Sequence, residues 1–326
     1  MDQMMAREPA LQSALGGGWF LAILPPTHLI MKPFTLLTLS LSLAIISVSS
    51  AADAPLRIIA FGAHPDDAEF QIGGTAIKWA KAGHKVKLVS VTNGDIGHWD
   101  IAGGPLAIRR TAEVKEAAKR MGIEVEVLDI HDGELEPTLE NRKKITRLIR
   151  SWNADIVFAH RPWDYHPDHR YVGVLVQDAA FMVAVPFICP DTPPLKKNPA
   201  FFYFPDRFKK PYEFQPDIAI SIDDVFEDKV NAVDALASQV YEGGALGSKQ
   251  TLLQRRVNDP KKRKEILRAS WSARQGGIAN RFRDELVKWY GKEKGGAVKH
   301  AEAFELCEYG RQPSEADLKK LFPFFD

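Results

Sequence analysis

The sequence predicts an α/β protein with a mostly parallel sheet and helices on both of its faces. Four short runs rich in Val and Ile have the length of buried strands: residues 56–63, 85–94, 124–130 and 154–160. Helical patterns separate these runs at residues 74–82, 106–121 and 140–152. This alternation is typical of βαβ units, whose parallel strands are buried on both faces. The site is therefore expected at the carboxyl ends of the strands.

The second half of the chain is expected to continue the same domain. Residues 185–216 are rich in Pro and aromatic residues and predict a long loop with one short strand beside the site. Residues 217–223 predict another strand, and residues 225–241 and 282–291 predict helices, the latter ended by Gly291. No internal repeat is visible. We expect a single domain at residues 55–326.

The overall charge gives no support for a nucleic-acid partner. The chain of 326 residues has 43 Lys and Arg against 42 acidic residues, and 45% of its residues are hydrophobic. A basic surface with interleaved aromatic residues, as nucleic-acid binding requires, is not evident. The near-zero charge and the aromatic residues at 200–204 favour an uncharged saccharide ligand.

The N-terminal region has the layout of a secretory signal peptide. Residues 31–54 contain one Lys, an apolar run at 34–48 and then small residues, and the apolar run is short for a membrane span. We expect Met31 to be the true start, residues 1–30 to be a non-native extension, and the protein to be exported to the periplasm or the extracellular space. An uncleaved signal anchor is the alternative, whereas signal cleavage leaves no stable membrane span. The two cysteines, Cys189 and Cys307, can pair or stay free thiols.

A first polar motif, AHPDD at residues 63–67, follows the first predicted strand. Pro65 suits a first helical turn, Asp66 can cap it, and Glu69 lies at the spacing of a capping box. Taken alone, the motif is more often a helix start than a metal site. That interpretation leaves His64 without a role.

A second motif of the same kind follows the fourth predicted strand, where HPDH at residues 166–169 opens another helix. Capping alone does not explain His and Asp residues at two strand ends. A divalent metal needs His and carboxylate ligands, and one short loop rarely supplies enough of them. Three protein ligands with one open position are typical of catalytic zinc. The two motifs together therefore indicate a metal site.

The pair of motifs resembles the PIG-L/LmbE-like family of zinc-dependent N-acetyl-sugar deacetylases, which have a Rossmann-like fold. The similarity extends from Leu56 to about Tyr309 and includes TNGDIGH at 92–98 and DIHDGEL at 129–135. The resemblance implies a small N-acetylated sugar or glycoconjugate of the GlcNAc type as substrate. It leaves the oligomeric state open.

The resemblance also implies roles for seven residues. His64, Asp67 and His169 correspond to the metal ligands, and Asp66 corresponds to the general base. His166 is expected to act opposite Asp66, stabilising charge or donating a proton. Arg110 and Asp132 are expected near the substrate. The alternative without a substrate role is a surface ion pair with Glu113 for Arg110 and a turn for Asp132.

These residue types suit the hydrolysis of an acetamide. Water bound to zinc has a pKa of about 9 in aqueous solution, and a favourable protein site lowers this pKa to about 7. A neighbouring carboxylate can then take the proton. Iron(II) accepts the same two His and one Asp ligands, so the sequence leaves the metal open. The alternatives are a zinc amidase acting on another acylated amine and a non-catalytic, metal-containing carbohydrate-binding protein. A pure binder has no need of Asp66.

Overall fold

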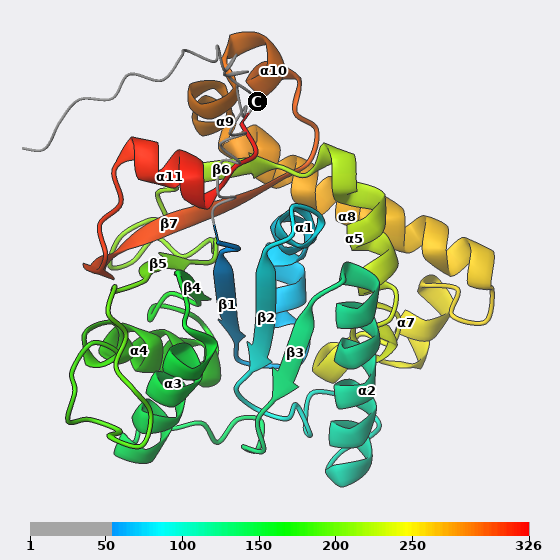
Figure 1. Cartoon of the computed structure of the whole chain (residues 1–326). Coiled ribbons are helices and arrows are strands. Elements are labelled where there is room, and N and C mark those ends of the chain that lie inside the picture. Colours follow the sequence, from blue (N-terminus) through cyan, green and yellow to red (C-terminus); the bar gives the residue numbers. More distant parts are fainter. Residues whose placement is uncertain (1–53, 326) are drawn as a thin grey trace, which may run out of the picture. The chain divides into compact units, whose positions relative to one another are not determined.

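The computed structural model describes residues 54–325, in which seven strands form one sheet (Figure 1). Their order in the sheet is β3-β2-β1-β4-β5-β7-β6, and only β7 runs antiparallel to its neighbours. The bounds are β1 Arg57–Gly62, β2 Lys85–Ser90, β3 Glu124–Val127, β4 Ile156–Ala159, β5 Ala200–Tyr203, β6 Ile218–Ser221 and β7 Ala301–Gly310. The predicted α/β class with a mostly parallel sheet is confirmed.

Helices connect the strands in the predicted order. The first four are α1 Asp67–Lys81, α2 Gly104–Met121, α3 Leu139–Trp152 and α4 Pro167–Met182. Those that follow are α5 Phe226–Val233, α6 Ala237–Val240, α7 Lys249–Gln254, α8 Pro260–Arg281, α9 Arg283–Tyr290, α10 Lys292–Ala297 and α11 Glu315–Leu321. Two 3₁₀ turns lie at Asp223–Val225 and Gly244–Leu246.

The core divides into two layers because successive residues of a strand point to opposite faces of the sheet. On β1, Ile58 and Ala60 pack in one cluster with residues of α1 and α2. Ile59 and Phe61 pack in the other cluster with residues of α3 and α4, the green helices of Figure 1. All four β1 side chains are fully buried, which explains the continuous apolar run of the sequence.

The strand order reverses between β1 and β4. Along the chain, β1, β2 and β3 add strands in one direction, and β4 and β5 then add strands on the other side of β1. This is the topological switch point at which ligands bind in open α/β sheets. Both His-Pro-Asp motifs directly follow the two strands that flank it.

Two glycines allow the helices that start at these motifs to lie close to the strands. A Cβ atom on Gly62 would lie 2.8 Å from Asp67 Cβ. A Cβ atom on Gly173 of α4 would lie 2.8 Å from the carbonyl oxygen of His160. Contacts this short are not tolerated, so any larger side chain would push the helix away from the strand end.

A buried ion pair joins α1, α5 and β7. Lys229 and Glu302 lie 2.5 Å apart with side chains that are 1% exposed. Glu302 also accepts hydrogen bonds from the backbone N–H groups of Gly74 and Thr75, at 2.8 and 2.7 Å. One carboxylate thus fixes the middle of α1, the helix that begins with the first motif.

Several expectations for the second half need correction. The short strand expected within residues 185–216 is confirmed as β5, but its three aromatic side chains are buried in the core, so they cannot stack on a ligand. Only Phe204 of the 200–204 run lines a cavity. The helix expected at 225–241 is two helices, α5 and α6, because Leu236 between them turns into the core and is fully buried. The expectations include no strand at 301–310, where Glu recurs at every third position instead of alternating with apolar residues.

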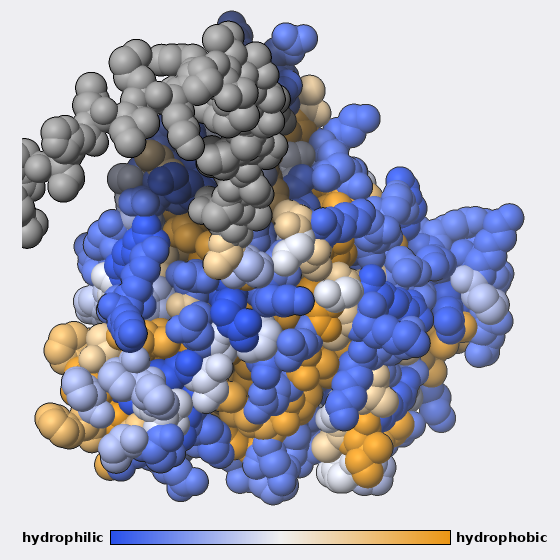
Figure 2. All heavy atoms as spheres, viewed as in Figure 1, coloured by the Kyte–Doolittle hydropathy of each residue, from blue (hydrophilic) through white to orange (hydrophobic). Residues whose placement is uncertain are grey.

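Both cysteines of the chain are free and buried, which decides between the two alternatives left by the sequence. The predicted extension at 1–30 and the signal peptide, up to residue 53, lie outside the described residues. No helix among residues 54–325 is both long enough and apolar enough to cross a membrane. Hydrophilic residues cover most of the face shown in Figure 2, and hydrophobic residues gather in its lower middle.

Replacing Lys229 by Met is expected to lower the free energy of unfolding by about 3–5 kcal/mol, because Glu302 then stays buried without its counter-charge. Urea denaturation followed by circular dichroism measures the change. As a matched control, Lys262→Met removes an exposed pair with Glu265 and should cost no more than about 1 kcal/mol. Equal losses in the two variants would contradict a special role for the buried pair.

Candidate metal centre and active site

A tight turn after β1 brings His64 and Asp67 together. The backbone N–H groups of Asp66 and Asp67 donate to the carbonyl oxygen of His64, at 2.9 and 3.2 Å. In return, the backbone N–H of His64 donates to Asp67 Oδ2 at 2.8 Å. The motif therefore folds into a local unit in which the two predicted ligands face each other.

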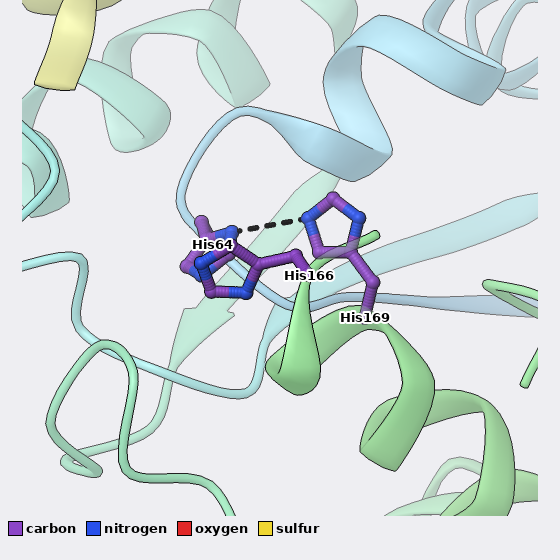
Figure 3. A group of neighbouring side chains, drawn as sticks. All are labelled: His64, His166 and His169. Carbon is purple, nitrogen blue, oxygen red and sulfur yellow. Dashed lines mark hydrogen bonds between the residues drawn. The ribbon is translucent and has the colours of Figure 1, made fainter. Parts of the chain in front are cut away.

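The second motif adds His169 to this pair. His169 Nε2 lies 3.3 Å from His64 Nδ1 and 3.4 Å from Asp67 Oδ2, and His64 Nδ1 lies 3.3 Å from Asp67 Oδ2. Figure 3 shows His64 from the β1–α1 turn facing His169 from the start of α4, with the His64–His169 contact dashed. The structure thus brings the three predicted metal ligands together.

The spacing of these three atoms fits a small divalent ion. Ligand atoms around a tetrahedral zinc ion with bonds of about 2.0–2.1 Å lie ~3.3–3.4 Å from one another. The measured edges are 3.3, 3.3 and 3.4 Å. Two imidazole nitrogens and one carboxylate oxygen are a donor set that zinc and iron(II) accept. The residues present therefore fit a metal ion.

Carboxylates hold the far nitrogen of each ligand histidine. His64 Nε2 lies 3.0 Å from Asp132 Oδ1 and 3.2 Å from Asp168 Oδ2. His169 Nδ1 lies 3.1 Å from Asp164 Oδ1. Because a ring nitrogen that donates to a carboxylate leaves the other nitrogen unprotonated, these contacts direct His64 Nδ1 and His169 Nε2 to the metal.

The charges of the centre support the same assignment. Burial lowers the pKa of His64, but the carboxylates of Asp132, Asp168 and Asp67 outweigh it and raise the pKa well above the usual value. Burial also lowers the pKa of His169, yet Asp67 and Asp164 raise it to about 10. Without a metal, protons on the histidines balance the carboxylates, and metal binding releases those protons.

Asp66, the predicted base, occupies the N-cap position of α1 but makes no side-chain capping bond. Its Oδ1 instead accepts a hydrogen bond from Arg110 Nη2 at 3.2 Å. Burial raises the pKa of Asp66, and the Arg110 guanidinium opposes that shift. The capping interpretation therefore does not hold, since Glu69 is also buried with both carboxyl oxygens unpartnered and a pKa of about 8.

The structure places Arg110 and Asp132 behind the ligands. Arg110 is 2% exposed, and it donates to the carbonyl oxygens of Gly94 and Pro65 besides Asp66. The alternative Arg110–Glu113 surface pair is wrong, because Glu113 pairs with the neighbouring Arg109 at 3.1 Å. Neither Arg110 nor Asp132 lines the large cavity described below, so both lie where they orient Asp66 and His64. A direct contact of either with substrate stays a prediction.

His166, the second predicted catalytic residue, lies beside the predicted metal ligands but is not among the residues that line the cavity described below. Its ring centroid is 4.6 Å from that of His64 and 5.2 Å from that of His169. Its Nδ1 accepts a hydrogen bond from the Asp168 backbone N–H at 3.2 Å, which caps α4. Burial and the neighbouring histidines lower the pKa of His166, so the neutral ring, with Nε2 as its donor, is favoured over the protonated ring.

A cavity of about 830 Å³ opens beside the centre and is lined by Asp66, Asp67 and His169. This size lies within the range of small-molecule sites. Tyr165, 72% exposed, lines it with its ring 5.5 Å from that of His169. The predicted base and two predicted ligands therefore face a space that can hold a substrate.

Sequence reasoning assigned no role to Asp164, and it left His160, at a strand end, between a structural and a supporting role in the site. Asp164 holds His169, and His160 stacks on the His169 ring with centroids 4.1 Å apart. His160 Nε2 also lies 3.4 Å from Asp67 Oδ2 and 3.2 Å from the backbone N–H of Ala63. Both residues lie between the end of β4 and the HPDH motif at the start of α4. Their closeness to that motif in the sequence was the signal that could have indicated a role in the site.

Comparison with known proteins identifies the family. A family model described as PIG-L, GlcNAc-PI de-N-acetylase, matches residues 59–180. The diacetylchitobiose deacetylase of Thermococcus kodakarensis is 32% identical over 197 residues, which cover 57% of this chain and 71% of that protein. This chain belongs to the PIG-L/LmbE-like family. All seven predicted site residues of this PIG-L/LmbE-like protein lie within the matched segment.

Solved structures share the fold. The N,N'-diacetylchitobiose deacetylase of Pyrococcus horikoshii is 24% identical with a TM-score of 0.58, covering 77% of this chain and 83% of that one. The 4-carboxy-2-hydroxymuconate hydratase of Pseudomonas putida KT2440 is 18% identical with a TM-score of 0.62, covering 80% and 99%. At these identities the likeness concerns the fold alone.

Replacing Asp164 by Asn is expected to weaken metal binding about 10- to 100-fold, because the amide holds His169 Nδ1–H less strongly than the carboxylate does. Competition with a chromophoric chelator measures the affinity. Asp191→Asn, which changes a surface aspartate paired with Arg147, is the control and should leave the affinity unchanged. An unchanged affinity in Asp164→Asn would show that this contact does not support the ligand.

The metal-free protein is expected to lose stability as pH rises. The pKa of His169 is about 10 in the folded protein, above its ordinary value of 6.5, so its stabilising contribution is complete below pH 6.5 and disappears towards pH 10. Urea unfolding in EDTA across this range measures the decline. His169→Gln should show a shallower decline than wild type, and identical slopes would contradict the assignment.

Proposed function

We propose that this PIG-L/LmbE-like protein is an exported zinc-dependent hydrolase that removes the acetyl group from an N-acetylated sugar of the GlcNAc type. The observation that carries the proposal is the triangle of His64 Nδ1, Asp67 Oδ2 and His169 Nε2, with Asp66 next to it on the wall of the same cavity. Three ligands and a separate carboxylate base suit metal-assisted hydrolysis.

The relatives support an N-deacetylation. The relative from Thermococcus kodakarensis is a diacetylchitobiose deacetylase, and the family model is that of a GlcNAc-PI de-N-acetylase. The 4-oxalmesaconate hydratase of Pseudomonas putida is also a sequence relative, at 23% identity over 187 residues, but this is lower than the 32% of the deacetylase and does not favour a hydration reaction here. The choice between the two rests on the site residues and on the closer sequence relative.

Within this proposal, each side chain has a defined task. His64, Asp67 and His169 would hold a metal ion, which would supply the Lewis acidity that lowers the pKa of water and polarises an amide carbonyl. Asp66 accepts the proton of the attacking water, and Arg110 keeps its carboxylate oriented. His166 Nε2–H donates to the oxyanion that develops on the substrate. Asp66 then returns the proton to the leaving amine.

Zinc is proposed because the ligand atoms have the spacing of a tetrahedral site. Iron(II) is the alternative with the same ligands. A sugar is proposed as substrate because the cavity has a suitable size and the exposed ring of Tyr165 offers a stacking surface at its wall. Export is proposed from the signal-peptide pattern at residues 31–54.

The test is acetate release from N-acetylated sugars and other acyl amines, with added zinc, with added iron(II) and with chelator. Metal-dependent acetate from a GlcNAc-type sugar supports the proposal, whereas acetate only from other acylated amines favours the amidase alternative. Tight sugar binding without acetate favours a metal-containing carbohydrate-binding protein. Sequencing the N-terminus of the protein recovered from its source tests signal cleavage.

Replacing Asp66 by Asn is expected to reduce kcat about 10²- to 10⁴-fold while the metal stays bound, since the base is lost and the three ligands remain. Metal content and acetate release are measured on the same preparation. Asp228→Asn, which changes an exposed aspartate paired with Lys81, should keep full activity. Loss of the metal in Asp66→Asn would instead make Asp66 a fourth ligand.

A further inference from the structure

Two arginines without acidic partners lie on the cavity wall away from the metal ligands. Arg274, Gly277, Ile278 and Arg281 line the cavity from α8, and their spacing places them on one face of that helix. Arg207 lines it from the segment that follows β5. Arg207 and Arg274 are both exposed to solvent.

The other two cavity arginines are already neutralised. Arg161 Nη1 lies 3.4 Å from Asp206 Oδ1. Arg281 donates to the carbonyl oxygen of Asp206 at 2.8 Å and pairs with Glu213 at 3.2 Å. The guanidinium groups of Arg207 and Arg274, in contrast, form no hydrogen bond or salt bridge with any residue between 54 and 325.

The acidic residues that line the cavity contact other groups and form no salt bridge with Arg207 or Arg274. Asp66 pairs with Arg110, and Asp67 and Asp164 contact the ligand histidines. With a divalent ion on the ligands, the negative charge near the centre is balanced further. The positive charges of Arg207 and Arg274 are therefore left over on the cavity wall.

Arg274 is held in place on aromatic rings. Its guanidinium carbon lies 5.1 Å from the centroid of Trp271 and 5.8 Å from that of Phe70. Although solvent reaches its side chain from the cavity, the protein atoms packed around Arg274, and after them the positive charge of Arg207, lower its pKa, and the more weakly acting charges of Asp66, Asp67 and Glu302 only partly offset that shift. Since arginine keeps its charge under all ordinary conditions, two such groups side by side favour a bound anion.

We propose that Arg207 and Arg274 form a subsite for an anionic group, a carboxylate or a phosphate, carried by the substrate beyond its acetamide. This inference rests on the proposed deacetylation of an N-acetylated sugar. An anionic substrate replaces the uncharged saccharide that the near-zero net charge of the chain favoured. A net charge near zero is compatible with a local excess of positive charge on the cavity wall. Guanidinium groups recognise both carboxylate and phosphate through paired N–H donors.

The subsite comes from parts of the chain outside the family match. The predicted metal ligands and base lie within residues 59–180, whereas Arg207 and Arg274 follow that segment. The shared segment supplies the chemistry at the acetamide. The segment after β5 and helix α8 supply the wall that meets the rest of the substrate, so these two arginines are specificity residues of this chain.

The test compares kcat/KM for neutral and anionic N-acetylated sugars. The neutral sugars are N-acetylglucosamine and N,N'-diacetylchitobiose, and the anionic ones are N-acetylglucosamine 1-phosphate, N-acetylglucosamine 6-phosphate and N-acetylmuramic acid. Wild type should prefer at least one anionic sugar, and the phosphate and carboxylate arms identify the group. The preference should weaken as NaCl rises from 50 to 500 mM.

In the double variant Arg207→Gln/Arg274→Gln, the ratio of kcat/KM for the preferred anionic sugar to that for N-acetylglucosamine should fall about 10- to 100-fold, mainly through KM. Arg268→Gln is the matched control, since Arg268 is an exposed arginine of α8 that pairs with Glu227 and does not line the cavity. It should keep the wild-type ratio. An unchanged ratio in the double variant would overturn the subsite.

Binding separates failure of the subsite from failure of the proposed function. Calorimetry with metal-loaded Asp66→Asn protein measures the affinity for the same sugars without turnover. Tighter binding of an anionic sugar, abolished when the two arginine substitutions are added, supports the subsite even if wild type releases no acetate. Equal binding of neutral and anionic sugars rules the subsite out, whatever the activity.

Discussion

Buried negative charge at the carboxyl ends of β1 and β4 is the constraint on which the rest of the site depends. Five aspartates, at positions 66, 67, 132, 164 and 168, converge around two histidines. Carboxylates this close cannot all stay ionised unless positive charge balances them. Arg110 and the starts of α1 and α4 supply part of that balance. A divalent ion between His64, Asp67 and His169, as we propose, would supply the rest.

The fold serves this constraint by bringing two strand ends together at the switch point of the sheet. Gly62 and Gly173 let α1 and α4 lie close to the strands, so the two motifs meet. The Lys229–Glu302 pair then fixes α1 against α5 and β7. The motif turn is thus supported from behind by a core that has no part in the chemistry.

The same fold carries different reactions, as the likeness to both a deacetylase and a hydratase demonstrates. What distinguishes the reactions must therefore lie in side chains at the strand ends and in the cavity wall. In this protein the two come from different parts of the chain. Residues 59–180 carry the predicted ligands and base, and the segment after β5 together with α8 carries two arginines that line the cavity.

The sequence by itself determined the α/β class, the parallel strands and which side chains form the candidate metal site, because these depend on local periodicity and on two short motifs at strand ends. His64, Asp67 and His169 meet as predicted. Tertiary structure alone decided that Arg110 pairs with Asp66, that Asp164 and Asp168 hold the ligand histidines, and that Phe201 and Phe202 belong to the core. It also decided that Arg207 and Arg274 share a cavity. Each of these relations joins residues by packing between separate elements, and a local pattern contains no information on which elements will touch.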